Sequence, residues 1–312
     1  MSGVDQFEIQ ATRDDRAFDA YAMVDWSSSS KPVRGSNSIW IASGSWCGRT
    51  FALDEPLNPA TRMEAEGRLP EKIHQWAGKR ILIGFDFPFG YPAGFAKALG
   101  LQDVGQSWRA LHSHFAANVT DSPENKHKRD AFAEECNRRI NGREAPGPFW
   151  GCTKSAASAA LTTRRAFTFP HHGLEEWRVT EREAKKKVTT LSVWKLNCGV
   201  SVGGQTILGI KYLDELARTV DARRWPFEGW DVASEPGIWF AEIFPSLVDY
   251  PKWRAAYAKP RDRTQVQSCV RRAAKRDREG LLGDDFARPV LLDRDEKLAQ
   301  QVEDEEGWIL WV

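Results

Sequence analysis

Short apolar runs that end in an acidic residue are the clearest pattern along this chain. Residues 20–25 (AYAMVD) and 81–86 (ILIGFD) are nearly continuous apolar runs closed by an aspartate, and residues 237–246 (GIWFAEIFPS) carry Glu242 after their apolar core. Runs of this length without polar alternation are typical of strands buried on both faces of a sheet. The pattern therefore predicts three buried strands, each with a carboxylate at its exit.

The stretch between the first two runs predicts two more strands and a helix. Residues 38–44 and 49–54 alternate well enough to form two strands with a turn at 46–48. From residue 59 to residue 77 the apolar positions recur at helical spacing, and Pro70 is expected to split this helix because it has no N–H to donate. The order strand, strand, strand, helix, strand predicts an α/β fold, an RNase H-like mixed sheet with flanking helices.

The second half of the chain is less regular. Residues 91–190 are polar with helical spacing, and we expect them to form a largely helical insertion. Beyond the insertion, residues 191–197 predict a strand and residues 207–219 an amphipathic helix, and Asp262 is placed to cap a further helix at 263–278.

The two ends of the chain differ in character. Residues 1–19 are polar and predict a loose lead-in. The remainder, residues 20–312, is interpreted as a single RNase H-like domain that carries the insertion at 91–190. The closing residues 307–312 (GWILWV) are apolar, which predicts a strand or tail docked on the core.

Composition narrows the class of protein. With 41% hydrophobic and 28% charged residues, the chain can bury a core without disulfides or a structural metal. Its five cysteines form no CxxC pair, and no apolar run reaches the roughly 18 residues of a membrane helix, so we expect a cytoplasmic protein without membrane contact. The formal charge is only +1, but residues 259–279 carry eight Lys and Arg against three acids. This asymmetry permits an anionic partner.

The carboxylates at the strand exits are the candidate chemistry. Asp25, Asp86 and Glu242 each follow a predicted strand, and Asp262 at a helix start would complete the set. Any one of them is consistent with a turn or a helix cap. The carboxyl ends of neighbouring parallel strands meet in one crevice, however, and hard oxygen ligands suit Mg²⁺ or Mn²⁺. We predict these four residues as metal ligands and catalytic residues for water attack on a phosphodiester.

Several short motifs resemble one family. They are Val24–Ser27 (VDWS), Gly84–Gly90 (GFDFPFG), Trp194–Leu196 with Gly199–Gln205 and Gly209–Ile210, Trp225–Trp230 (WPFEGW), Glu242–Ser246 (EIFPS), Arg261–Val266 (RDRTQV) and Glu305–Leu310 (EEGWIL). Together they resemble a widespread family of uncharacterised bacterial proteins, a domain of unknown function predicted to be an RNase H-fold nuclease. The resemblance spans roughly residues 20–310. It implies a metal-binding core at Asp25, Asp86 and Glu242, with Asp262.

Four further residues are predicted to contact a nucleic acid or nucleotide substrate. They are Ser27, Lys195, Gly203 and Gln205. Lys195 departs from the family pattern, in which a glutamine is usual; a lysine near a metal site can bind phosphate, but it can equally be an exposed strand residue. Gly203 belongs to a glycine-rich turn that can place backbone N–H groups at a helix N-terminus, where a phosphate can bind.

Three other functions compete with the nuclease hypothesis. Residues 199–203 match the G-x-S-x-G nucleophile elbow, but a hydrolase of that class needs a histidine after the serine, and the last histidine here is His172. An actin-like or sugar-kinase-type ATPase shares the RNase H-like core and strand-end acids, but it needs two such domains with paired phosphate loops. A non-catalytic scaffold would retain the fold and use its acids structurally.

Overall fold

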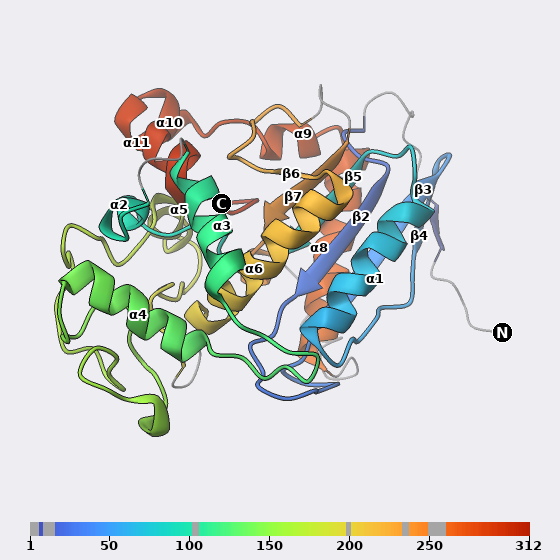
Figure 1. The fold of residues 1–312 in the computed structure, drawn as a ribbon. Coiled ribbons are helices and arrows are strands. Elements are labelled where there is room, and N and C mark those ends of the chain that lie inside the picture. The colour runs from blue at the N-terminus through green and yellow to red at the C-terminus, as the bar shows by residue number, and fades with distance from the viewer. Residues whose placement is uncertain (1–5, 9–15, 102–105, 198–200, 233–236, 249–259) are drawn as a thin grey trace.

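A seven-stranded mixed sheet forms the centre of the computed structural model, which describes residues 6–8, 16–101, 106–197, 201–232, 237–248 and 260–312. The strand order is β1-β4-β3-β2-β5-β7-β6 (Figure 1). β2, β3 and β4 are antiparallel neighbours, whereas β5 runs parallel to β2, and β7 runs parallel to both β5 and β6. The strands are β1 (Gln6–Glu8), β2 (Ala20–Asp25), β3 (Trp40–Cys47), β4 (Thr50–Leu53), β5 (Ile81–Phe85), β6 (Arg223–Arg224) and β7 (Ile238–Glu242).

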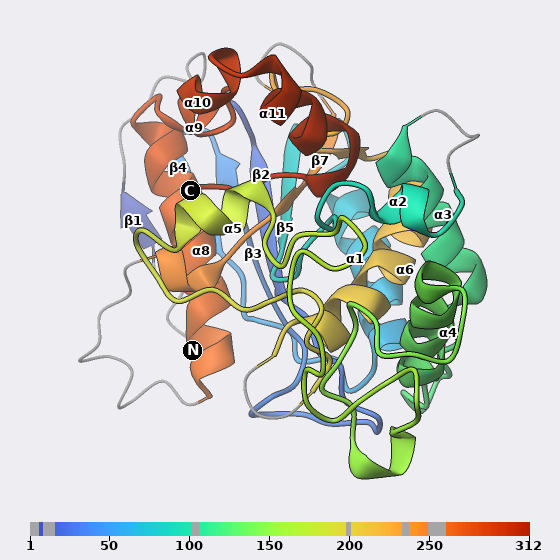
Figure 2. The same cartoon turned by 90° about the vertical axis from the view of Figure 1, so that its left-hand side faces the viewer.

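Helices cover both faces of this sheet. α1 (Arg62–Gln75) and α6 (Gly203–Val220) pack on one face, and α8 (Arg261–Arg278) packs on the other, against β2 and β3 (Figure 2). No helix in the described ranges is long and apolar enough to cross a membrane. The remaining helices are α2 (Phe95–Ala98), α3 (Ser107–Asn118), α4 (Arg129–Asn141), η3 (Lys154–Ala156), α5 (Val179–Ala184), η4 (Pro245–Leu247), α9 (Leu282–Asp285), α10 (Val290–Asp293), α11 (Glu296–Gln301) and η5 (Val302–Glu306).

The alternation of side chains along β2 decides which face the site occupies. Ala22 and Val24 lie in the apolar core beneath α1 and α6, whereas Tyr21 and Met23 lie in the core beneath α8. Successive side chains on a strand point to opposite faces, so Asp25 at the end of β2 lies on the α8 face.

Most of the predicted strands and helices are confirmed, but several details differ, and residues 6–8 of the predicted loose lead-in form strand β1. Residues 191–197 form no strand, and their only ladder contact is an isolated bridge between Lys195 and Trp150. Pro70 does not split its helix, because α1 continues through it to Gln75. Asp262 is not the cap of α8, because the helix begins one residue earlier, at Arg261.

The insertion at 91–190 is less helical than expected. It contributes α2, α3, α4 and α5, but residues 142–178 hold only the three-residue η3 as a helix. This stretch is stabilised by side chains instead. Buried Asn137 accepts a hydrogen bond from the Phe149 N–H and donates to the Phe149 and Ala160 carbonyls. A buried polar side chain therefore forms hydrogen bonds with backbone groups that a helix would have paired with each other.

The C-terminal tail docks on the sheet as predicted. Ile309 forms a parallel bridge with Glu242, and the Leu310 N–H donates to the Glu242 carbonyl at 2.9 Å. Residues 305–311 are all buried. The tail therefore extends the sheet beyond the carboxyl end of β7 and closes that side of the site.

Two helical glycines give a matched test of the packing. An added Cβ at Gly209 in α6 would lie 2.7 Å from the buried Phe87 ring, whereas an added Cβ at Gly67 in α1 would meet nothing within 4 Å. We expect Gly209→Ala to lower the free energy of unfolding by about 1–3 kcal/mol, because the core around Phe87 must shift. We expect Gly67→Ala to raise it by about 0.5–1 kcal/mol, because alanine restricts the unfolded chain. Urea denaturation measures both, and equal shifts would contradict this packing.

Candidate active site

Asp25 and Asp86 lie side by side at the centre of the sheet edge. β2 ends at Asp25 and β5 ends at Phe85, and the Asp86 N–H donates to the Val24 carbonyl at 2.9 Å. From β2 the chain continues to β3 on one side, and from β5 the sheet continues to β7 on the other. Ligands of open α/β sheets bind outside the carboxyl ends of the strands at such a switch point.

Both carboxylates lie on the α8 face of the sheet. Asp86 follows Phe85, which belongs to the core on the opposite face, so strand alternation turns Asp86 toward α8, as it does Asp25. The thiol of Cys269 on α8 reports the same placement, because its pKa is raised by burial and then by the charges of Asp86 and Asp25. α8 also brings Asp262 to this side, where its carboxylate accepts a hydrogen bond from the Asn37 N–H at 2.7 Å.

Burial and neighbouring charges raise the pKa of both aspartates. Burial, followed by the charges of Asp86 and Asp262, raises the pKa of Asp25 well above its usual value. Burial, followed by the charges of Glu242 and Asp262, raises the pKa of Asp86 to about 7. Neither Asp25 nor Asp86 forms a side-chain hydrogen bond or ion pair with another residue that the structure describes. Among the described residues, the pair therefore has no cationic partner that would stabilise its charged form.

The donor chemistry of this pair fits a small divalent cation. Within the described ranges, no group of three or more His, Cys, Asp or Glu side chains is arranged to hold one metal ion. Mg²⁺ commonly takes only one or two carboxylates and completes its shell with water and substrate phosphate oxygens. The carboxylates of Asp25 and Asp86 supply that number of hard oxygen ligands, and Mn²⁺ accepts the same donors.

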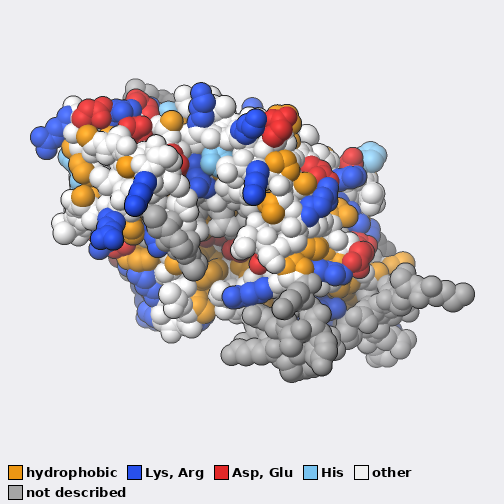
Figure 3. All heavy atoms as spheres, turned by 90° about the horizontal axis from the view of Figure 1, so that it is seen from below, with side chains coloured by type: hydrophobic (Ala, Val, Ile, Leu, Met, Phe, Trp, Pro, Cys, Tyr) orange, Lys and Arg blue, Asp and Glu red, His pale blue; other side chains and the backbone are white. Residues whose placement is uncertain are grey.

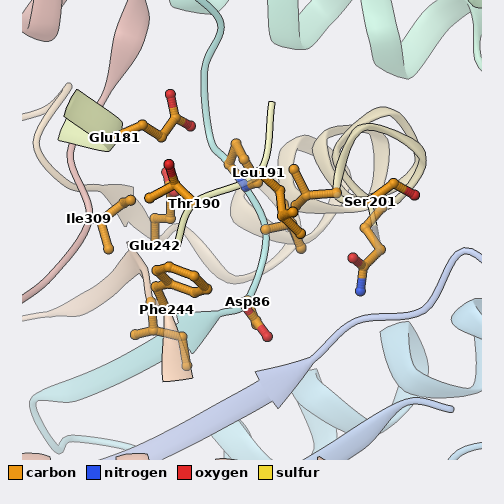
Figure 4. A pocket seen from close by; sticks show the side chains of 13 residues that line it. Asp86, Glu181, Thr190, Leu191, Ser201, Glu242, Phe244 and Ile309 are labelled. Carbon is orange, nitrogen blue, oxygen red and sulfur yellow. The ribbon is translucent and has the colours of Figure 1, made fainter. Parts of the chain in front are cut away.

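Glu242 lies near enough to Asp86 for its charge to raise the Asp86 pKa, but its carboxylate is bound by other groups. It pairs in register with Phe85 rather than with Asp86, so its side chain leaves the opposite face of the sheet. Its carboxylate accepts two hydrogen bonds from Arg178, at 2.6 and 2.8 Å, and one from the Phe89 N–H at 3.0 Å. Figure 4 shows Glu242 and Asp86 pointing in different directions. The structure therefore gives Glu242 a buried ion pair instead of an open ligand position.

Two cavities adjoin the acids and share a wall. The larger one, about 630 Å³, is lined by Asp25, Asp262 and the serine-rich loop at 27–30, and the smaller one, about 200 Å³, is lined by Asp86 and Glu242. Ser201, just before α6, and Gln205 in its first turn line both. Figure 3 shows this end of the molecule hollowed, with Lys and Arg side chains around the hollow.

The predicted substrate contacts divide into two groups. Ser27 and Gln205 line the larger cavity, and the Gln205 side chain donates to the Trp26 carbonyl at 2.5 Å. Gly203 packs instead, because its N–H donates to the Lys195 carbonyl and an added Cβ would lie 2.4 Å from a neighbouring carbonyl oxygen. Lys195 lies over the Trp150 ring at 5.8 Å and lines neither cavity. Neither residue lines either cavity, and the phosphate roles predicted for Gly203 and Lys195 stay predictions.

Buried arginines shape the larger cavity, and the sequence analysis missed them. Arg62 is fully buried, pairs with Asp121 and donates to the carbonyls of Ser27 and Ser29. Arg129 lines the cavity and donates to the Ser28 carbonyl at 3.0 Å. Three consecutive loop carbonyls are thus held by two guanidinium groups. No local motif marks these arginines, because their partners are distant in the sequence.

Comparisons of the chain with protein-family models, with curated proteins and with solved structures found no match. The family resemblance stays a prediction, and function has to be inferred from the geometry of the site.

Proposed function

We propose that this protein is a divalent-metal-dependent hydrolase of phosphodiester bonds, and specifically a nuclease. One observation carries the proposal: Asp25 and Asp86 end adjacent parallel strands, share one face of the sheet and have no cationic partner among the described residues. Two buried carboxylates that repel each other are unfavourable in isolation, and a bound divalent cation removes the repulsion.

The sheet order supports an RNase H-like core. Three antiparallel strands, β2, β3 and β4, are followed by α1, and β5 then pairs in parallel with β2. This is the order expected from the sequence, with Asp25 and Asp86 after the first and fourth strands of that core.

We assign roles to the residues of the chain from their positions. Asp25 and Asp86 would hold Mg²⁺ or Mn²⁺, which supplies Lewis acidity and lowers the pKa of bound water. Asp262 lies at the edge of the site, where its charge reaches both aspartates, so it would orient water or complete an ion's shell. Glu242, paired with Arg178, would position the β7 end of the site and not bind the ion.

The cationic wall of the larger cavity favours an anionic substrate. Lys31 and Arg129 line it, together with the serine-rich loop and Asn37. A guanidinium, an ammonium and several hydroxyls suit contacts with phosphate oxygens along a nucleic-acid backbone. The cavity also opens directly onto Asp25, so a bound phosphodiester would lie against the acids.

The test is metal-dependent cleavage of fluorescent oligonucleotides by purified protein. We expect cleavage with Mg²⁺ or Mn²⁺, none with EDTA, and a loss of at least about 100-fold in Asp25→Asn or Asp86→Asn, because ligand loss should exceed the 10–100-fold effect of outer-shell partners. Asp293→Asn, at an exposed position in α10, is the control. Cleavage that survives both aspartate substitutions would refute the proposal, as would ATP turnover with intact nucleic acid.

A further inference from the structure

The smaller cavity differs in chemistry from the larger one. Its wall is mainly apolar, built from Phe87, Pro88, Leu191, Phe244 and Ile309 beside Asp86 (Figure 4). No Lys or Arg of the described ranges lines it, whereas Lys31 and Arg129 line the larger cavity. An apolar wall without a cation does not favour phosphate, but it does suit a flat, uncharged ring.

Two of the three acids in this wall are already paired with an arginine. Glu181 and Glu242 line the cavity, and both carboxylates pair with buried Arg178, at 2.8 and 2.6 Å. The Arg178 guanidinium therefore compensates the charges of Glu181 and Glu242. Asp86, at the edge of the cavity, has no such partner among the described residues.

Phe244 is placed to stack on a ring. It follows β7, is only partly buried and belongs to none of the three apolar cores, unlike Phe87, which packs in the core beneath α1 and α6. Figure 4 shows its ring in the cavity, near Asp86. Leu191 on the opposing segment is likewise partly exposed and outside the cores. Two apolar side chains are therefore left open to the cavity.

A buried hydroxyl supplies a polar contact in the same cavity. Thr190 is 7% exposed, and its Oγ1 has no hydrogen-bond partner among the described residues. It lines the cavity together with Phe244. A buried hydroxyl without a partner is unfavourable, and the edge of a nucleobase offers both donors and acceptors that would satisfy it.

We propose that this cavity binds one unpaired nucleobase next to the scissile phosphate, so that the substrate is single-stranded nucleic acid. The inference rests on the proposed nuclease function. The backbone would lie along the Lys31 and Arg129 side, and the adjoining base would enter past Asp86 to stack on Phe244 and bond Thr190. A paired base cannot enter such a pocket without leaving its duplex.

The experiment measures binding without catalysis. Fluorescence anisotropy in EDTA compares a short single strand, the matching duplex and a strand of abasic sugars, each as DNA and as RNA. We expect the single strand to bind more tightly than the other two. Phe244→Ala should weaken binding of the single strand about tenfold, as expected for loss of one stacking contact, and leave the abasic strand unchanged.

Matched variants separate stacking from general damage. Phe244→Tyr should restore binding, and Thr190→Val should weaken it without lowering the thermal midpoint. Phe167→Ala removes a partly exposed ring that lines neither cavity and should have no effect. Equal loss on the base-containing and abasic strands, or equal affinity for duplex, would overturn the base pocket. Cleavage is measured separately, so selective single-strand binding without any cleavage would refute the nuclease function and leave the pocket standing.

Discussion

A loss of about 3–5 kcal/mol in the free energy of unfolding is the expected result of Arg178→Met. Arg178 is fully buried, binds both oxygens of Glu242 and one of Glu181, and donates to the Glu306 carbonyl at 2.7 Å. Methionine fills a similar volume but leaves two buried carboxylates without a cation. Removing one partner of a buried ion pair costs this much because the remaining charge stays desolvated.

The matched control is Arg138→Met on the surface helix α4. Arg138 is 37% exposed in its side chain and pairs with Glu134 at 2.7 Å and with two other glutamates. Solvent screens these pairs, so we expect a much smaller loss than for Arg178→Met. Urea denaturation measures both variants, and similar losses would contradict a stabilising role of the buried pair.

A double variant sharpens this test. Adding Glu242→Gln to Arg178→Met removes one of the uncompensated charges. The double variant should therefore lose less free energy of unfolding than the two single variants lose together. A strictly additive loss would show that the cost comes from packing and not from the unpaired carboxylate.

Asp86→Asn is expected to stabilise the metal-free protein at pH 8 by roughly 2–4 kcal/mol. The pKa of Asp86 is raised from its usual value of 3.8 to about 7, mainly by burial and by the charge of Glu242. Each unit of such a shift corresponds to about 1.4 kcal/mol of difference between the two protonation states. Asparagine removes the buried charge while keeping the shape, so the variant should unfold later than the wild type.

The sign of the pH dependence follows from linkage. Between about pH 4 and pH 7 the folded state holds the Asp86 proton more tightly than the unfolded state does. The stability of the wild type should therefore fall as the pH rises through this window, and the advantage of the variant should vanish at pH 4. Thermal unfolding in EDTA, at a series of pH values, measures this. A wild type whose stability is flat from pH 4 to pH 8 would contradict it.

Metal addition completes the same experiment. At pH 8, Mg²⁺ should raise the thermal midpoint of the wild type, because ligand binding to the folded state alone adds stability, and it should do little for Asp86→Asn. The exposed Asp293→Asn variant should respond like the wild type. An equal response of all three proteins would show that the ion binds elsewhere.

Local patterns were sufficient to predict the strands that carry the site. The runs at 20–25, 81–86 and 237–246 form β2, β5 and β7, because short continuous apolar runs suit strands that are covered on both faces of a sheet. The pattern at 191–197 failed for a related reason. Its apolar residues are buried by the helices and loops of the insertion, so no strand pairing is needed to shield them.

The sequence by itself determined that Asp25 and Asp86 stand at strand ends. A carboxylate inside a buried strand would be desolvated at a high cost, so an acid that closes an apolar run is expected at the edge of the sheet. Only the tertiary structure decided that these two share a face while Glu242 does not. Glu242 pairs with Phe85, one residue before Asp86, and a step of one residue turns a side chain to the other face of a sheet. Arg178, 64 residues away in the chain, then pairs with it. Register and long-range pairing of this kind arise from packing between distant segments, which local periodicity does not encode.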